Sequence, residues 1–113
     1  MTTIYHNPRC SKSRECLLLL ENQSKEVTVV NYIKDPLSKA QIEKLIKLLG
    51  INPIDLVRTN ETEWKENYKG KKLTDAQIIT ALQKHPKLIQ RPIVVQGDKA
   101  VIARPAEVAL SIL

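Results

Sequence analysis

The residues best suited to chemistry surround a cysteine near the N-terminus, in the segment YHNPRCSKSRE (residues 5–15). Cys10 follows a short β-like run and a proline, and small hydroxyl residues and then a leucine-rich segment come after it, so we expect it at the start of a helix. A thiol reacts as its thiolate, and a helix N-terminus or nearby cations lower the thiol pKa. Free backbone N–H groups at such a helix start also bind anions. This setting favours a nucleophilic cysteine that meets an oxyanion.

Side chains close to this cysteine could stabilise a thiolate or hold an approaching anion. His6 is titratable, and Ser13 lies one helical turn after Cys10, from where it can point back toward the sulfur. Ser11 and Lys12 add a hydroxyl donor and a positive charge at the same helix start. The alternative is that Cys10 is a capping or core residue and Ser13 an ordinary first-turn residue. This segment alone does not decide between the two.

The second cysteine, Cys16, falls on the leucine-rich face of the same predicted helix and is expected to be buried and inert. Cys10 and Cys16 are six residues apart, which in a helix separates them by about 9 Å along the axis. A disulfide needs Cα atoms within roughly 7 Å of each other. No internal disulfide is therefore expected. With His6 and His85 the two cysteines have no zinc-site spacing, so no metal site is expected either.

The motif Cys-Ser-Lys-Ser has Ser13 where a CxxC redox pair has its second thiol. A reacting Cys10 must therefore be resolved by a thiol from another molecule.

Three arginines outside this segment have unusual settings. Arg58 ends the apolar turn IDLVR, Arg91 directly precedes Pro92, and Arg104 directly precedes Pro105. Planar, permanently charged guanidinium groups suit a tetrahedral oxyanion better than lysine does. Each of the three alone is more typical of a surface ion pair. Taken together, they favour a binding site for an oxyanion.

The composition is that of one globular domain, with 113 residues, 42% hydrophobic and 27% charged. A formal charge of +6 favours anionic partners. No aromatic residues are interleaved with a basic stripe, which argues against nucleic-acid binding. The N-terminus has no apolar stretch of signal-peptide length, and no apolar run is long enough to span a membrane. We therefore expect a cytoplasmic protein with no membrane partner.

The hydrophobic pattern of the first half predicts strand, helix, strand, helix. A short strand spans residues 2–5, and a helix begins near residue 11. The β-branched segment 26–33 predicts a buried strand. Ser38 precedes a helical period that ends at Gly50, which lies where a C-terminal cap belongs. Alternation of this kind is typical of a parallel unit with a right-handed crossover.

The second half predicts helices and then a hairpin. Residues 52–88 are helical, and His85–Pro86 ends the last helix of this lobe. A β-hairpin follows, with strands at 93–96 and 99–103 around a Gly97–Asp98 turn, and a terminal helix begins at Pro105.

This is the layout of an α/β thioredoxin-like fold with a helical insertion between the βαβα and ββα parts. We expect a single domain, 1–113, with a helical lobe at about 52–88. Pro92, entering the first hairpin strand, fits a cis peptide bond at a special bend. In this fold the proline loop lies against the start of the first helix. That placement would bring Arg91 beside Cys10, with Arg104 near.

Four motifs in combination closely resemble the glutaredoxin-dependent arsenate reductase (ArsC) family and its short bacterial members. They are YHNPRCSKSRE, LVR, IQRPIVV and ARPAEV, and the similarity runs in register from about Ile4 to Leu113. One departure is RCSKS, where the best-characterised plasmid-borne members have a small residue before the cysteine and Gly-Thr after it.

The resemblance implies a catalytic role for Cys10 as nucleophile and for Arg58, Arg91 and Arg104 as substrate and transition-state arginines. It implies that His6 and Ser13 activate the thiolate. In the family's reaction the thiolate attacks arsenate to give a cysteine–arsenic adduct, glutathione then attacks, and arsenate is reduced to arsenite. Glutaredoxin clears the resulting mixed disulfide with glutathione. The expected partners are thus arsenate or a similar oxyanion, glutathione as co-substrate, and glutaredoxin, with no bound cofactor.

Two alternatives remain open from the sequence. Spx-type transcription regulators are similar in fold and bind RNA polymerase without reducing arsenate, although many of them use a CxxC switch that Ser13 removes here. The other alternative is a glutathione-linked oxidoreductase that acts on a different substrate.

Overall fold

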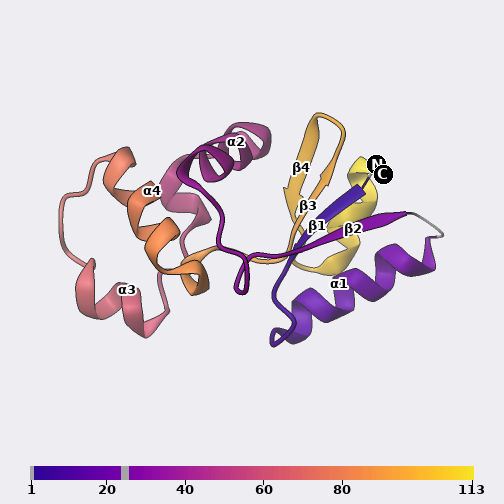
Figure 1. Cartoon of the computed structure of the whole chain (residues 1–113), viewed down its shortest axis with the longest axis horizontal. Coiled ribbons are helices and arrows are strands. Elements are labelled where there is room, and N and C mark those ends of the chain that lie inside the picture. Colours follow the sequence, from indigo (N-terminus) through magenta and orange to yellow (C-terminus); the bar gives the residue numbers. More distant parts are fainter. Residues whose placement is uncertain (1, 24–25) are drawn as a thin grey trace. The chain divides into compact units, whose positions relative to one another are not determined.

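The computed structural model of the chain describes residues 2–23 and 26–113. It divides into two compact units, one made of Met1–Asp35 and Arg91–Leu113 and the other of Pro36–Gln90. The first unit contains the β-sheet and Cys10, and the second is built from helices (Figure 1).

The first unit is organised around a mixed four-stranded sheet in the order β2-β1-β3-β4. The central strand β1 pairs parallel with β2 and antiparallel with β3, and β3 pairs antiparallel with β4. Burial alternates along β1, with Thr2, Ile4 and His6 buried and the residues between them partly exposed, so one face of this strand is buried. The strands are β1 (Thr2–His6), β2 (Val27–Asn31), β3 (Ile93–Gln96) and β4 (Lys99–Ile102).

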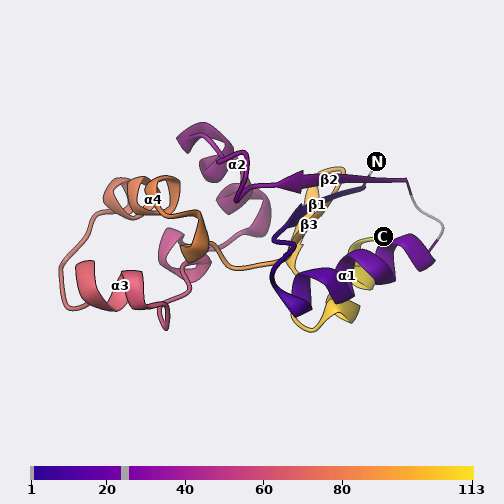
Figure 2. The same cartoon turned by 60° about the horizontal axis from the view of Figure 1, so that its bottom comes forward.

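Helix α1 (Ser11–Asn22) and the 3-10 helix η3 (Ala106–Ile112) lie on the same side of this sheet (Figure 2). The core that they share with β1 and β3 explains why α1 carries a leucine-rich face. Its buried members are Ile4, Cys16, Leu20, Val94, Ala103, Ala106 and Ala109. The start of α1 is thereby fixed at the end of β1.

The second unit consists of helices α2, α3 and α4 and two 3-10 turns. Ser38 and Thr74 each form a capping box at the start of α2 and α4, and Gly50 ends α2 in the left-handed conformation. An isolated antiparallel bridge joins Val57 to Ile89. The elements are α2 (Lys39–Leu49), η1 (Pro53–Leu56), α3 (Thr62–Asn67), α4 (Asp75–Lys84) and η2 (Pro86–Leu88).

The α/β thioredoxin-like prediction agrees with this architecture. The hairpin and the end of α4 before His85–Pro86 lie where the sequence predicts them. The Arg91–Pro92 peptide bond is cis as expected, and Arg104–Pro105 is also cis, which the sequence did not indicate. None of the helices in the described ranges is long and apolar enough to cross a membrane.

Three details of the fold differ from the sequence predictions. The predicted buried strand at 26–33 is wrong, because β2 is an edge strand and Val29 is 47% exposed. β-branched residues favour strands at an edge as well as in a core, so their presence did not report burial. The C-terminal segment is a 3-10 helix, and α2 belongs to the helical unit, which is therefore larger than the predicted lobe at about 52–88.

The capping box of α2 yields a test of the helical unit. Ser38 accepts a hydrogen bond from the Gln41 N–H, and the Gln41 side chain accepts one from the Ser38 N–H. We expect Ser38→Ala to lower the free energy of unfolding by about 1 kcal/mol, and Ser38→Asn, which retains a capping oxygen, to lower it far less. Urea unfolding of the three proteins measures both effects. Equal destabilisation by the two variants would contradict this account of the cap.

Candidate active site

Cys10 reaches the start of α1 through a tight turn that follows β1. The Cys10 N–H donates to the Asn7 carbonyl oxygen at 3.0 Å, which closes a turn over residues 7–10 with Pro8 in its second position. Cys10 itself has extended backbone angles and occupies the N-cap position, and α1 begins at Ser11. The half-buried thiol therefore faces the free N–H groups of the first helical turn.

These N–H groups and one arginine stabilise the thiolate of Cys10. Burial raises the pKa of this thiol, but hydrogen bonds to the sulfur from the Ser13 N–H and the Arg91 guanidinium lower it. The Lys12 N–H and the positive charge of Arg91 lower it further, and the resulting pKa lies below the ordinary cysteine value. The site thus favours a reactive thiolate over an inert capping thiol.

His6 and Ser13 form a buried pair that joins the end of β1 to the first turn of α1. The Ser13 Oγ lies 2.6 Å from the His6 Nδ1 and accepts a hydrogen bond from the Asn7 N–H at 3.0 Å. The expectation that the Ser13 hydroxyl points back toward the sulfur differs from this geometry, because both hydrogen bonds of the hydroxyl are made with the end of β1. Ser13 instead acts on Cys10 through its backbone N–H.

The surroundings of His6 favour its neutral form by lowering its pKa. Burial lowers its pKa, and the positive charge of Arg14 lowers it further, while the hydrogen bond with Ser13 has the opposite effect. A neutral imidazole contributes no positive charge to the Cys10 thiolate. Its contact with the Ser13 hydroxyl links the end of β1 to the first turn of α1.

Cys16 differs from Cys10 in both burial and pKa. It is fully buried in the core between α1 and the sheet, and burial raises its pKa to about 11, with a further contribution from Glu107. The thiol is therefore protonated at neutral pH. Both cysteines are free thiols in this structure.

The predicted arginines fall into different environments. Arg91 lies against the Cys10 sulfur, whereas Arg104, in the same unit, is exposed and is not among the groups that lower the pKa of Cys10 in the described part of the chain. Arg58 belongs to the helical unit. Its N–H donates to the Leu88 carbonyl at 2.7 Å and its side chain pairs with Glu61 at 2.8 Å. A joint clamp of all three arginines stays a prediction.

Ser11 and Lys12 are exposed in the first turn of α1. The Lys12 ammonium lies 3.9 Å from the Glu15 carboxylate, an exposed pair that contributes little to stability. Both side chains remain accessible to a ligand at the helix start. Among residues 2–23 and 26–113, no group of three or more His, Cys, Asp or Glu is arranged to hold a metal ion.

The order of strands, the helix start and the cysteine agree with one known family. The sequence model of the ArsC family matches residues 5–112. The chain belongs to the ArsC family.

Similar proteins cover nearly the whole of this ArsC-family chain. An uncharacterized protein of Escherichia coli K12, YfgD, is 46% identical over 97% of this chain and 94% of its own length. An arsenate reductase of Haemophilus influenzae is 42% identical over 97% of both chains. The solved structure of an arsenate reductase from Vibrio cholerae superposes with a TM-score of 0.95 at 43% identity, over 99% of this chain and 97% of the other.

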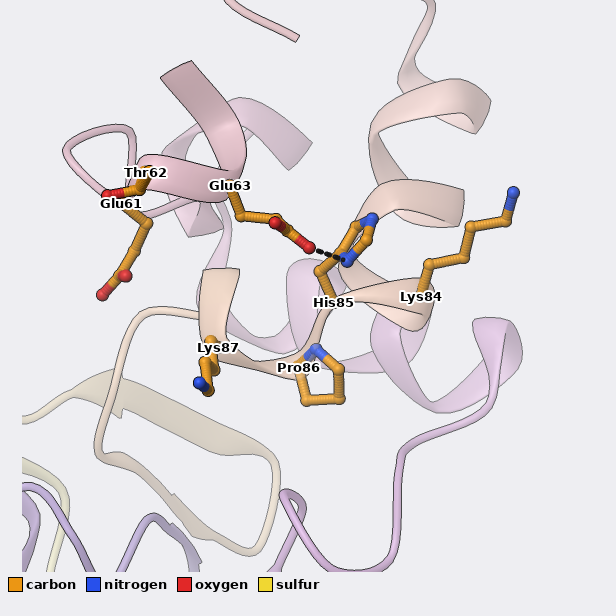
Figure 3. A pocket seen from close by; sticks show the side chains of 7 residues that line it. All are labelled: Glu61, Thr62, Glu63, Lys84, His85, Pro86 and Lys87. Carbon is orange, nitrogen blue, oxygen red and sulfur yellow. Dashed lines mark ion pairs between the residues drawn. The ribbon is translucent and has the colours of Figure 1, made fainter. Parts of the chain in front are cut away.

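A pocket of about 480 Å³ lies in the helical unit of this ArsC-family protein (Figure 3). Within it the Glu63 carboxylate points at the His85 ring (Figure 3). The Glu63 Oε1 lies 2.7 Å from the His85 Nδ1. Tyr68 packs edge-on against the same ring and stacks on Trp64. None of the described residues that line the pocket was predicted as a site residue. They are Glu61, Thr62, Glu63, Lys84, His85, Pro86 and Lys87.

Sequence reasoning missed the hydrogen bonds by which Asn7 and Arg14 shape the Cys10 turn. Asn7 makes backbone and side-chain hydrogen bonds within it, and the Arg14 Nη1 donates to the Pro8 carbonyl at 2.9 Å. Asn followed by Pro is a known turn signal and could have drawn attention to Asn7. The Arg14 contact depends on the side-chain conformation and left no pattern in the sequence.

The electrostatics of this ArsC-family site predict a pH profile. We expect the rate of Cys10 alkylation by iodoacetamide to reach half its plateau below the roughly 8.5 of a free cysteine. Arg91→Gln removes a charge and a hydrogen bond from the thiolate, so it should raise this midpoint by about one pH unit. Mass spectrometry of the labelled Cys10 peptide measures the rate at each pH.

Arg9→Gln is the matched control, because Arg9 is an exposed arginine of the same turn whose side chain does not lower the pKa of Cys10. Its midpoint should equal that of the wild type. An unchanged midpoint in Arg91→Gln, or an equal rise in Arg9→Gln, would contradict the role given to Arg91.

Proposed function

We propose that this protein is an arsenate reductase, which reduces arsenate to arsenite through a cysteine–arsenic adduct on Cys10 with glutathione and glutaredoxin as the reductant. The observation that carries the proposal is the Cys10 thiolate, stabilised at a helix N-terminus beside Arg91 in a member of the ArsC family. The relatives named arsenate reductase, similar over nearly the whole chain, support the choice of substrate.

The first step is attack of the Cys10 thiolate on arsenic(V). A sulfur–arsenic bond forms and an arsenic–oxygen bond breaks, and the oxygen leaves as water after taking protons from solvent. The N–H groups of Ser13 and Lys12 and the Arg91 guanidinium, which stabilise the thiolate, would then face the oxygens of the bound group. The same donors thus serve the nucleophile before attack and the oxyanion after it.

The reduction needs two electrons, which two thiols supply. Two molecules of glutathione and arsenate give arsenite, oxidised glutathione and water, with Cys10 regenerated. Glutaredoxin takes the glutathionyl group from the mixed disulfide by thiol–disulfide exchange. An external thiol is required because Ser13 has no sulfur and the Cys16 thiol is buried and protonated.

The remaining predicted groups are given supporting roles in this proposal. Arg58 and Arg104 would complete the oxyanion clamp with Arg91, while Ser11 and Lys12 would contact the substrate at the helix start. His6 and Ser13 would support the thiolate by fixing the first helical turn. Dependence on glutathione fits a protein of the reducing cytoplasm.

The nucleophile test uses both cysteines. Cys10→Ser should reduce arsenate-dependent NADPH oxidation, coupled through glutathione, glutaredoxin and glutathione reductase, to the rate without protein. Cys16→Ala, which removes the only other thiol without burying a hydroxyl, should retain most of the activity. Arg91→Lys should lower kcat/KM by roughly 10- to 100-fold, the value of a hydrogen bond to a charged group.

Two results would overturn the proposal. One is turnover by Cys10→Ser equal to that of the wild type. The other is the absence of arsenate-dependent turnover in the wild-type protein while a pull-down recovers RNA polymerase subunits, which would favour the Spx-type alternative.

A further inference from the structure

The turn that delivers Cys10 to α1 is held together largely by one residue. The Asn7 carbonyl accepts from the Cys10 N–H at 3.0 Å, and the Asn7 N–H donates to the Ser13 Oγ at 3.0 Å. The Asn7 side-chain Oδ1 accepts from the Arg9 N–H, also at 3.0 Å. Asn7 is only 7% exposed, so water does not readily replace these bonds.

The side-chain bond of Asn7 determines the shape of this turn. An asparagine that accepts from the N–H two residues later forms an Asx turn, which restricts the backbone before the helix. Here the restricted residues are Pro8 and Arg9, and the next residue is Cys10 itself. A small rotation of the turn would move the sulfur away from the N–H groups of the first helical turn.

We propose that Asn7 is a positioning residue for the nucleophile: its Oδ1 holds the Arg9 N–H and so aims the Cys10 sulfur at the N–H groups of Lys12 and Ser13 and at Arg91. The inference rests on the proposed function only in taking Cys10 as the reacting group. Asn7 touches neither the sulfur nor the substrate in this role. It acts through the backbone of the turn.

The chain contains a matched control for this role. Asn31, at the end of the parallel neighbour β2, pairs across the sheet with His6. Its Oδ1 accepts from the Ile33 N–H at 3.2 Å and the Lys34 N–H at 3.1 Å, so it forms the same kind of Asx turn. Asn31 leads into a different segment, however, and does not contribute to the pKa of Cys10. Loss of the Asn31 side chain should lower the free energy of unfolding without changing the pKa of the Cys10 thiol.

The experiment measures the pH midpoint of Cys10 alkylation in Asn7→Ala, Asn7→Ser and Asn31→Ala, each in the full chain. Asn7→Ala should raise the midpoint by about one pH unit, since the stabilising donors lose their alignment. Asn7→Ser keeps a weaker oxygen acceptor for the Arg9 N–H and should raise it by about half as much. The alkylation midpoint of Cys10 in Asn31→Ala should equal that of the wild type. The free energy of unfolding of each variant is measured alongside.

An unchanged midpoint in Asn7→Ala, or an equal rise in Asn31→Ala, overturns the proposal and leaves Asn7 with a structural role only. If Asn7→Ala does not fold, the test rests on the alkylation midpoint of Asn7→Ser. A midpoint in Asn7→Ser equal to that of the wild type then overturns the proposal. The titration involves no arsenate, so a failure of the proposed reductase activity would leave its result intact.

Discussion

The site depends on a competition between burial and hydrogen bonding at one sulfur atom. Partial burial alone would raise the pKa of Cys10, as complete burial raises that of Cys16 in helix α1. Two backbone N–H groups and one guanidinium reverse this effect for Cys10. Because these donors are directional, the sulfur must lie at the N-cap of α1 within narrow limits. The turn after β1 and the His6–Ser13 pair provide that placement.

The pairing of β1 with β3 brings the third donor, the Arg91 guanidinium, to the Cys10 sulfur. β1 and β3 are antiparallel with Tyr5 opposite Ile93, so continuing the ladder places the residues just before β3 opposite those just after β1. Arg91 therefore reaches the Cys10 turn although 81 positions separate the two residues in the chain. The hairpin that contains β3 is thus part of the site, since any slip in its register would remove the arginine.

The sequence predicted the parts of this arrangement that have local causes. The helix start at Cys10, the Gly50 cap and the hairpin turn follow from residue types over a few positions. The edge position of β2 depends on which strands meet in the sheet, which composition does not encode. The rotamer of Ser13 and the bonds of Asn7 depend on packing at the end of β1, so the sequence indicated a role for Ser13 but not the atoms through which it acts.

The central claim is that the Cys10 thiolate receives an arsenate ion, and competition with alkylation tests it most directly. At a fixed pH and constant ionic strength, arsenate should slow the labelling of Cys10 by iodoacetamide in a saturable manner, with chloride, which is not an oxyanion, as the control salt. Sulfate, a tetrahedral oxyanion that thiols do not reduce under these conditions, should also protect if the donors bind the anion's oxygens. Equal labelling rates in arsenate and chloride at every concentration would contradict the account.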